Sequence, residues 1–526
     1  MTISNWTWNE RQLEAINNGI LKRSFNLIGS AGTGKTTTLR GLLKHMLEKH
    51  AIPIMTSSTA WLSSGTPGVV LVSFTRRAVR NIALQMPEDL KRHCLTIHRL
   101  LEYAPEYYDD YNEKGEMVKK IRFVPTRNRA NPLPSELTTV VIDESSMVDT
   151  ELFAKLVDAL PLPSRVQFIF LGDLNQLPPV YGNAILGQKL LELPIVELTQ
   201  VYRQALESPI IALAIGLKNN HFADFNKTAT SDWAAPRMFD VKSVTEKITF
   251  HAPNRGKVSL IPWKKRWDPD FSLRAVQDRV PTWIKEGVYD PEEDIILSPW
   301  NKWVDEINLS VADYLGRQRD AFVWEVIAGY NKYYFAVGDK LLVDKQDAVI
   351  LDIYKNPKYL GKRTHSPSKT RNRWGKDTTV DEFDTDELDV DALLESYSAD
   401  DVEDRTAQCS HIIKVRFLDT DEEQLLSASA MLNNTKFAYA TTVHKSQGSE
   451  WRRVLFITDY CHQAMLGREL VYTAVTRAKE ELIVLMSPQM LAKAAARPKI
   501  KGDTLAAKLE WFKQRLSEKA QENDDG

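Results

Sequence analysis

The sequence predicts an α/β protein with two parallel β-sheets, each covered by helices. Short apolar runs alternate with helix-like stretches, which is the pattern of buried parallel strands joined by crossover helices. This pattern occurs once in the first 200 residues and again toward the carboxyl terminus. The chain of 526 residues is also too long for one compact core, so two to four domains are expected.

The first α/β domain is expected over residues 1–200. Helix-like stretches at 35–49 and 76–86 lie between apolar runs whose composition suits strands buried on both faces. These runs are 25–29, 69–73, 139–143 and 167–172.

A second α/β domain is expected over residues 201–340 and 430–526. Its apolar runs are 294–298, 453–458 and 481–486. Residues 102–134, rich in Tyr, Lys, Arg and Asn, fit a β-hairpin inserted into the first domain, with its turn at Asn112–Gly115. Residues 341–429 form a larger insertion into the second domain.

Composition limits the class of protein only weakly. The net charge of −2, from 68 basic and 70 acidic residues, does not exclude nucleic acid, because a binding channel needs local charge. The three cysteines have no CxxC spacing, so neither a disulfide framework nor a zinc site is expected. No signal pattern and no apolar run of about 18 residues is present, so we expect a cytoplasmic protein that does not bind membranes.

The strongest local pattern is Gly29–Thr36 (GSAGTGKT), which matches G-x-x-x-x-G-K-[ST] between a predicted strand and a predicted helix. Its glycines let the backbone wrap around a phosphate, and N–H groups at the helix start point toward it. Lys35 is expected to hold the β- and γ-phosphates of ATP, and the Thr36 hydroxyl to bind Mg²⁺. The nucleotide-binding candidates here are Gly29, Gly32, Thr33, Gly34, Lys35, Thr36 and Thr37.

Two adjacent carboxylates end a neighbouring apolar run. Asp143 is expected to hold Mg²⁺, and Glu144 to orient or deprotonate the attacking water. Alone this pair is a weak signal, since strands often end in acids. Together with the phosphate-binding loop it predicts a nucleoside triphosphatase.

Four further side chains are candidates for the nucleotide site. The amide of Gln12, about two turns before the first strand, could read the edges of adenine, and Gln176 in GDLNQLPP could sense the γ-phosphate. Arg203 and Arg477 could act as arginine fingers held by a second domain. Taken singly, either arginine would be interpreted as an ordinary surface residue. Residues 443–450 (VHKSQGSE) add Gly448 and Glu450 to the nucleotide-binding candidates.

In their order along the chain and in their residues, these segments resemble the motifs of superfamily-one helicases of the B branch, above all the RecD-type and Dda-type helicases. TVHKSQGSE and RELVYTAVTRA resemble the RecD type most, and GDLNQLPPV and DESSMVD fit the same group. The resemblance covers residues 12–204 and 294–486, and it is weak over 205–290 and 345–430.

The resemblance implies an ATP-dependent DNA helicase that moves 5′-to-3′ on single-stranded DNA, with one chain as the motor unit. It implies two RecA-like motor domains that clamp one ATP, a strand-separating hairpin at 102–134, and an SH3-like insertion domain at 341–429. The implied partners are single-stranded DNA, junctions of single- and double-stranded DNA, and proteins of replication, recombination or repair. The implied setting is a bacterium or a phage-infected bacterial cell.

DNA contacts are implied at residues that match the family's motifs. Phe74, Thr75 and Arg77 lie in SFTRRA, where Phe74 replaces the proline usual in the family. That ring could stack on a base or pack inward. The other candidates, which touch phosphates in a sequence-independent way, are Thr96, His98, Ser298, Pro299, Thr442, His444 and Lys445.

Several alternatives remain open. The motifs do not separate a helicase from a translocase or an RNA helicase of the same superfamily, because they reveal no 2′-hydroxyl contacts. A third alternative is an ATPase switch or loading subunit that needs a partner to unwind. In the larger insertion, a basic block at 355–376 precedes an acidic block at 381–404. These blocks are typical of a solvated loop, or form a DNA-contacting loop that the acidic block masks.

Overall fold

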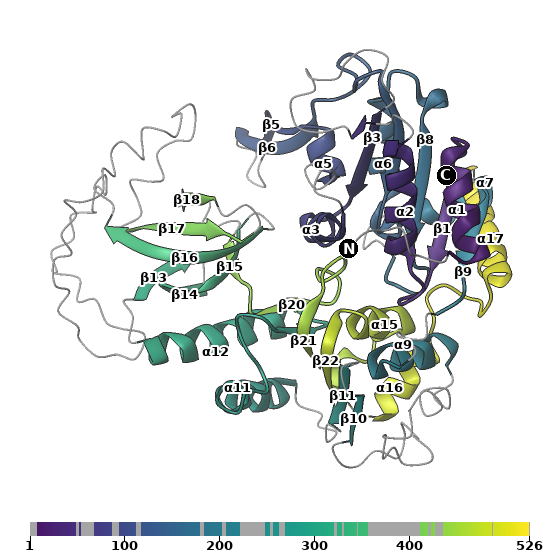
Figure 1. The fold of residues 1–526 in the computed structure, drawn as a ribbon. Coiled ribbons are helices and arrows are strands. Elements are labelled where there is room, and N and C mark those ends of the chain that lie inside the picture. Colours follow the sequence, from purple (N-terminus) through teal and green to yellow (C-terminus); the bar gives the residue numbers. More distant parts are fainter. Residues whose placement is uncertain are drawn as a thin grey trace. The chain divides into compact units, whose positions relative to one another are not determined.

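The computed structural model of the chain (Figure 1) divides by internal contacts into two compact units. Unit 1 comprises Met1–Trp267 and Val443–Gly526, and unit 2 comprises Asp268–Thr442. The structure describes residues 8–48, 52–53, 68–86, 94–111, 117–178, 184–201, 207–220, 248–252, 256–261, 269–319, 323–328, 331–343, 346–355, 411–418, 422–426, 435–486 and 488–524. The division into two motor domains and an insertion domain stays a prediction.

The first sheet of unit 1 is parallel throughout. Its strands follow the order β2-β3-β7-β8-β1-β9, and β4 pairs with β3. In a parallel sheet the carboxyl ends of all strands lie at one edge, and loops from β1, β7 and β8 therefore meet there. The strands are β1 (Phe25–Gly29), β2 (Ile52–Pro53), β3 (Gly68–Ser73), β4 (Cys94–Thr96), β7 (Leu137–Ile142), β8 (Gln167–Gly172) and β9 (Ile195–Leu198).

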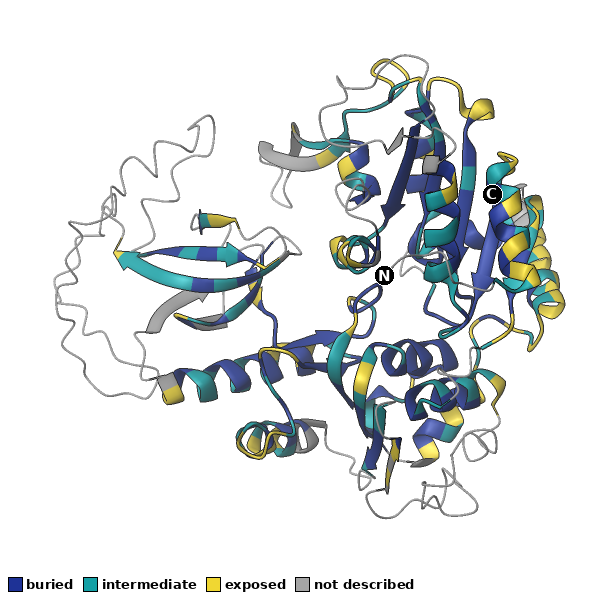
Figure 2. Ribbon diagram, viewed as in Figure 1, coloured by how far each residue is buried: buried dark blue, intermediate teal, exposed yellow. Residues whose placement is uncertain are grey.

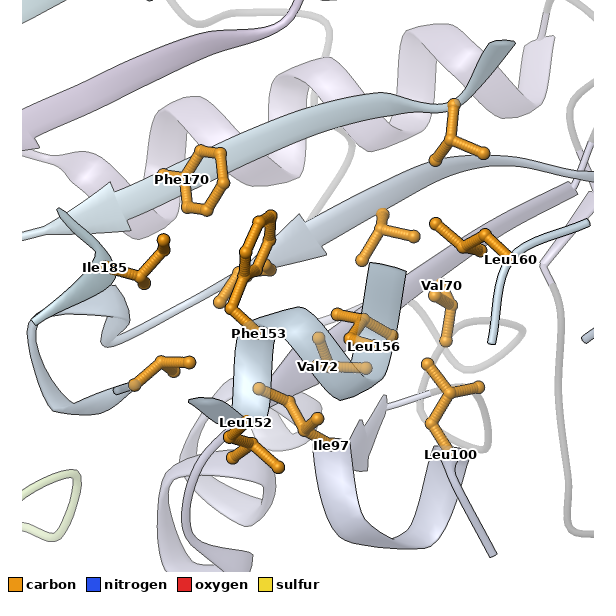
Figure 3. Close-up of a cluster of buried hydrophobic side chains, with 14 of the residues drawn as sticks. Val70, Val72, Ile97, Leu100, Leu152, Phe153, Leu156, Leu160, Phe170 and Ile185 are labelled. Atoms are coloured by element: carbon orange, nitrogen blue, oxygen red, sulfur yellow. The ribbon is translucent and has the colours of Figure 1, made fainter. Parts of the chain in front are cut away.

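Side chains alternate between two apolar clusters, one on each face of this sheet. On β3, Val70 and Val72 join one cluster, whereas Val69 and Leu71 join the other. Figure 3 shows the first cluster, in which Phe153 of α6 lies near Phe170 of β8. Burial on both faces explains why these strands read as continuous apolar runs.

Helices cover both faces of the first sheet, and Figure 2 shows its strands as a buried band. Residues of α1, α2 and α3 contribute to one apolar cluster, and residues of α5, α6 and α7 to the other. The helices are α1 (Glu10–Ile20), α2 (Lys35–Glu48), α3 (Arg76–Gln85), α5 (Ile97–Leu100), η2 (Ser145–Met147), α6 (Thr150–Asp158), η3 (Pro163–Arg165) and α7 (Ile185–Glu192).

An antiparallel hairpin of β5 (Tyr103–Tyr111) and β6 (Met117–Pro125) interrupts the first sheet between α5 and β7. At its base the Arg127 guanidinium forms a bidentate pair with the Glu102 carboxylate, at 2.8 and 3.0 Å. The hairpin expected within 102–134 is therefore present, while its turn at Asn112–Gly115 lies outside the described residues.

Unit 1 contains a second group of strands in the order β10-β11-β22-β21. β11, β22 and β21 are parallel, and β10 pairs antiparallel with β11. Helix α17 contacts α7, which belongs to the first sheet. The elements are α9 (Pro209–Asn219), β10 (Ile248–Ala252), β11 (Gly256–Ile261), β21 (Trp451–Ile457), η5 (Tyr460–His462), α15 (Arg468–Val475), β22 (Ala478–Leu485), α16 (Pro488–Ala495) and α17 (Leu505–Asp524).

Unit 2 combines a parallel strand pair, β12 and β20, with an antiparallel sheet in the order β18-β17-β16-β15-β19. Strands β13 and β14 form a separate hairpin. The elements are α11 (Pro269–Lys285), β12 (Ile295–Ser298), α12 (Asn301–Arg319), β13 (Val323–Ala328), β14 (Asn331–Ala336), β15 (Lys340–Val343), β16 (Gln346–Lys355), β17 (His411–Phe417), β18 (Glu423–Leu426), β19 (Thr435–Phe437) and β20 (Ala440–Thr442).

The predicted α/β class, with parallel sheets and antiparallel insertions, is confirmed. The SH3-like form of the larger insertion stays a prediction. Residues 356–410, with nearly all of the basic and acidic blocks, lie outside the described residues. Within the described part of the chain, no helix combines the length and the apolar composition that crossing a membrane requires.

Candidate nucleotide site and nucleic-acid contacts

The loop from β1 to α2 has the backbone of a phosphate cradle. Gly32 and Gly34 adopt φ angles of +77° and +84°, a region that side chains other than glycine rarely adopt. A Cβ at Gly29 would lie 2.3 Å from Thr33 Oγ1, so no side chain fits there. The three glycines of the pattern are thus each required by this backbone, which fits the phosphates of a nucleotide.

Polar side chains line this loop. Lys35 Nζ donates to the carbonyl oxygens of Gly29 (2.5 Å) and Ser30 (3.2 Å). Thr33 Oγ1 donates to the Ser30 carbonyl at 2.8 Å. Thr36 and Thr37, both half-buried, lie in the first turn of α2. The ammonium and hydroxyl groups therefore gather at the start of one helix.

Asp143 and Glu144 follow β7 directly, at the same edge of the sheet as the phosphate loop. Burial, and secondly the adjacent Glu144 carboxylate, raise the pKa of Asp143 to about 7, whereas Lys35 opposes this shift. Glu144 adopts φ +49°, which is costly for a residue other than glycine and is typical of functional sites. The hydroxyl of Thr36 and these carboxylates are the oxygen donors that Mg²⁺ prefers, so the set fits this cation.

Gln12 is held by the start of α1. Its Oε1 accepts the Asn9 N–H at 3.2 Å, and Asn9 Oδ1 accepts the Gln12 N–H at 2.9 Å, a reciprocal capping box. The side chain is only 1% exposed, and its Nε2 has no hydrogen-bond partner among the described residues. A buried, unpaired donor on a fixed amide fits the predicted contact with a base.

The loop after β8, Asp173–Gln176, lies against the phosphate loop. Asp173 Oδ1 accepts the Asn175 N–H at 2.9 Å and Asn175 Nδ2 at 2.8 Å. Asn175 Nδ2 also lies 3.3 Å from Ser30 Oγ. Gln176 is 7% exposed, and its Oε1 has no partner in the described part of the chain.

Residues from the carboxyl-terminal part of the chain reach both loops. Tyr472 of α15 accepts the Ala31 N–H at 3.0 Å and donates to Asp173 Oδ2 at 2.8 Å. Thr473 Oγ1 accepts the Leu177 N–H at 3.0 Å, and Gln447 Nε2 donates to the Leu177 carbonyl at 2.7 Å. Segments far apart in the sequence are thus joined by direct hydrogen bonds within unit 1, while their role at a nucleotide stays a prediction.

The structure describes only one of the two predicted arginine fingers. Arg477, 4% exposed, donates to the carbonyls of Thr473 and Ser449, each at 3.1 Å. Arg203 lies outside the described residues. Of the other candidates, Gly448 adopts φ +74°, and the exposed Glu450 lies 3.6 Å from Lys479.

The candidate DNA contacts of the first sheet lie at helix starts. Thr75 caps α3, and Thr96 caps α5, each through its side-chain oxygen. The His98 ring lies between those of Phe74 and Tyr103, with ring centroids 5.7 and 4.9 Å away in edge-on geometry. Phe74 is half-buried against the apolar cluster, and these contacts leave both of its predicted roles possible.

The loop 443–450 lies against helix α3 in unit 1. Asn81 Nδ2 donates to the Gly448 carbonyl at 2.8 Å, and the Arg77 guanidinium lies 5.5 Å from the centre of the Trp451 ring. His444 is half-buried, and burial lowers its pKa. Lys445 is exposed. Thus Thr75 and Arg77 lie on an element that the loop bearing His444 and Lys445 contacts.

The remaining candidates belong to unit 2. Ser298 and Thr442 are neighbours in the parallel pair of β12 and β20, and Pro299 follows β12 directly. All three are buried. The Oγ of Ser298 has no hydrogen-bond partner among the described residues.

Sequence reasoning assigned no role to several residues that the structure places at this site. Tyr472, Asp173 and Asn175 lie inside motifs that were recognised. Their polar side chains within those motifs were the signal that could have identified them. Lys218 of α9 donates to Ser30 Oγ at 2.9 Å, and Lys508 of α17 donates to Asn175 Oδ1 at 2.8 Å. No local pattern distinguishes these two lysines from surface lysines.

This combination of a phosphate loop, an acidic pair and distant motifs that reach the loop is typical of P-loop nucleoside triphosphatases. Residues 12–182 match the AAA domain family, and residues 437–485 match the UvrD-like helicase C-terminal domain. The chain is 26% identical over 474 residues to the ATP-dependent RecD2 DNA helicase of Deinococcus radiodurans, covering 90% of this chain and 48% of that protein.

A second relative is the RecBCD enzyme subunit RecD of Haemophilus influenzae, 25% identical over 514 residues, with 93% of this chain and 70% of that one covered. The crystal structure of Pif1 helicase from Candida albicans is similar at a TM-score of 0.45 and 15% identity, over 97% of this chain and 100% of that one. Over about nine tenths of its length the chain is similar in sequence to RecD2 and RecD, which confirms the resemblance of its motifs to the RecD type.

Proposed function

We propose that this chain is an ATP-dependent DNA helicase that moves 5′-to-3′ along single-stranded DNA. The observation that carries the proposal is the bridge made by Tyr472, whose hydroxyl joins the phosphate-loop residue Ala31 to Asp173. A motor needs the nucleotide to control the contact between two groups of elements. Here hydrogen bonds from α15 reach the loop that would hold the phosphates.

The nucleotide would be held and hydrolysed by residues from both parts of unit 1. The glycine-rich loop and Lys35 would hold the phosphates, and Gln12 would contact the base. Glu144 would orient and deprotonate the attacking water, with Gln176 sensing the γ-phosphate. Arg203 and Arg477 would stabilise charge on the transferred phosphoryl group. Mg²⁺ at Thr36 and Asp143 would supply further positive charge to the phosphates.

Hydrolysis would move DNA because the nucleotide site and the DNA contacts share elements. The loop 443–450 contacts α3 through Asn81 and leads, through β21, to α15, which carries Tyr472 and Thr473. A change at the phosphates can therefore alter the position of Thr75 and Arg77 relative to His444 and Lys445. Alternating grip on DNA phosphates by these groups is sequence-independent and suits a translocating motor.

The hairpin β5–β6 is the proposed strand separator. Phe123 on β6 is 67% exposed, so it presents an apolar ring to solvent. An exposed aromatic ring on a hairpin can replace a base in the stack when a duplex opens. The proposed partners are single-stranded DNA, junctions of single- and double-stranded DNA, and proteins of replication, recombination or repair, with one chain as the motor unit.

The direct test is strand separation on three duplexes, with a 5′ tail only, a 3′ tail only, or both. ATP and Mg²⁺ are supplied, and Lys35→Ala is the control that lacks the phosphate-binding ammonium. Unwinding of the 5′-tailed duplex that is lost in the control supports the proposal. Unwinding only from the 3′ tail contradicts the direction.

A second candidate is a motor subunit that unwinds only within a complex. The observation that favours it is the match over 514 residues to a protein named as a subunit of the RecBCD enzyme. DNA-stimulated hydrolysis without unwinding of any of the three duplexes would support this candidate over the first. Stimulation by RNA rather than DNA would instead favour an RNA-directed enzyme of the same superfamily.

A further inference from the structure

The carboxyl-terminal helix α17 packs against the first sheet of unit 1. Leu505, Leu509 and Phe512 pack against the apolar cluster shown in Figure 3, and α17 contacts α7. The contact is tight, because a Cβ at Gly187 of α7 would lie 2.6 Å from Phe512 Cε1. The helix therefore has a defined docking site on the domain that carries the phosphate loop.

Lys508 lies on the docked face of this helix rather than on its solvent face. Its side chain belongs to a residue only 9% exposed, and its Nζ donates to Asn175 Oδ1 at 2.8 Å and to the Leu174 carbonyl at 3.5 Å. Lys513, further along α17, has a side chain that is 62% exposed. Burying an ammonium is costly unless it is paired, so a lysine here requires the partners it finds.

The partners of Lys508 belong to the nucleotide site. Asn175 precedes Gln176, accepts from Lys508 through Oδ1, and through Nδ2 contacts both Asp173 and Ser30. Ser30 lies in the phosphate loop, and its Oγ also accepts from Lys218 at 2.9 Å. A continuous path of hydrogen bonds thus runs from α17 through Asn175 to the phosphate loop.

We propose that Lys508 is a positioning residue for the nucleotide site, acting through Asn175 on Ser30 and on the loop that carries Gln176. The inference rests on the proposed function, because it concerns the same ATP site. With the ammonium in place, the Asn175 side chain is held with its Nδ2 toward Ser30 and Asp173. Without it, the amide can rotate and the two loops lose their shared restraint.

Burial disfavours the charged form of Lys508, so the polar contacts of its ammonium are what offset the desolvation cost. Burial is the main influence on Lys508 and lowers its pKa, and Lys218 acts in the same direction, whereas Asp173 opposes them. A methionine would fill much the same volume at lower desolvation cost, and would give up both polar contacts. The test can therefore separate packing from positioning.

The experiment uses the full chain with Lys508→Met, Lys508→Arg and the matched control Lys513→Met. ATP and ADP affinity are measured by titration calorimetry, and kcat and KM by steady-state hydrolysis with single-stranded DNA. Loss of a hydrogen bond to a charged group predicts that Lys508→Met weakens ATP binding and raises KM about tenfold, with kcat changed less. Lys508→Arg restores most of the affinity, and Lys513→Met leaves both constants unchanged.

A merely structural role would give a different result, because a loss of folded protein lowers kcat without raising KM. The route through Asn175 is tested by repeating Lys508→Met in an Asn175→Ala background. If Lys508 acts through Asn175, Lys508→Met should change ATP affinity little in the Asn175→Ala variant, because the Asn175 amide is already absent. An equal effect in both backgrounds, or an unchanged KM in Lys508→Met, overturns it.

Failure of this inference and failure of the proposed function can be told apart. A wild-type chain that binds ATP but unwinds no duplex contradicts the helicase proposal and leaves the calorimetric test of Lys508 intact. A wild-type chain that binds no ATP contradicts both. If Lys508→Met does not fold, Lys508→Arg and Asn175→Ala decide, and the inference then requires weakened ATP binding in Asn175→Ala.

Discussion

The hydroxyl of Tyr472 is the smallest group whose removal tests the contact between distant motifs. Tyr472→Phe removes one oxygen from a fully buried ring and leaves its packing unchanged. Burial, and then the charge of Asp173, raise the pKa of Tyr472 well above its ordinary value. The hydroxyl therefore keeps its proton at neutral pH and donates a hydrogen bond to Asp173 Oδ2.

The expected cost follows from the two hydrogen bonds that are lost. The Ala31 N–H would be left unpaired, which costs about 1–3 kcal/mol, and the bond to a carboxylate is worth about 1.5–3 kcal/mol. Asp173 retains its hydrogen bonds from Asn175, so its carboxylate still has hydrogen-bond donors in the variant. If the two losses add, Tyr472→Phe lowers the free energy of unfolding by about 2.5–6 kcal/mol.

Urea unfolding followed by circular dichroism measures this loss. Tyr314→Phe, at a half-buried tyrosine of α12 in unit 2, is the matched control and should change the free energy of unfolding by about 0.5 kcal/mol or less. ATP affinity should fall together with stability, since Ala31 belongs to the phosphate loop. A change below about 0.5 kcal/mol in Tyr472→Phe would refute the bridge as a stabilising contact.

Two further predictions concern a glycine and a histidine of unit 1. Gly448→Ala should destabilise the chain by about 1–3 kcal/mol in urea unfolding, because the new Cβ would lie 2.5 Å from Ala78 Cβ at a φ of +74°. His462 is buried, and its pKa is lowered from 6.5 to about 4, mainly by burial. Between about pH 6.5 and pH 4 this histidine is therefore protonated in the unfolded chain and neutral in the folded chain. The free energy of unfolding should fall by about 3 kcal/mol as the pH drops through this window.

The controls for these two predictions are different. Gly287→Ala is the control at an exposed glycine with a positive φ, where no atom lies within 4 Å of the added Cβ. It keeps the backbone strain without the clash, so it should lower the free energy of unfolding less than Gly448→Ala does. Equal losses would contradict the role of the contact with Ala78. For the histidine, His462→Asn keeps an acceptor near the Asp459 N–H and removes the titration. If the variant loses stability with acid as steeply as the wild type, His462 is not the group responsible.

Much of the fold follows from local patterns. The strand expected at 25–29 is β1, and the run at 167–172 is β8, because side chains buried on both faces leave a continuous apolar signature. The hairpin of β5 and β6 was predicted from composition and a turn signal. By contrast, the short strand β4 and the hairpin of β13 and β14 were not predicted, since they are stabilised by pairing with neighbours rather than by apolar periodicity.

The nucleotide site was predictable in its residues but not in its connections. Lys35, Asp143 and Gln12 were predicted because each motif carries its own local pattern, and their roles stay predictions. The bridge from Tyr472 to Ala31 joins residues 441 positions apart, and no local pattern encodes such a distance. Lys508 lies in α17, where Lys, Glu and Gln residues are common, and no local pattern marks its side chain as buried.

The most direct test of an ATP-driven motor at this site is the rate of ATP hydrolysis by the wild-type chain with and without single-stranded DNA, beside Lys35→Ala and Glu144→Gln. We expect hydrolysis that single-stranded DNA stimulates and that both substitutions abolish, with ATP binding retained in Glu144→Gln because Glu144 acts on water rather than on the phosphates. Hydrolysis that is indifferent to DNA, or that persists in Lys35→Ala, would contradict an ATP-driven motor built on this site.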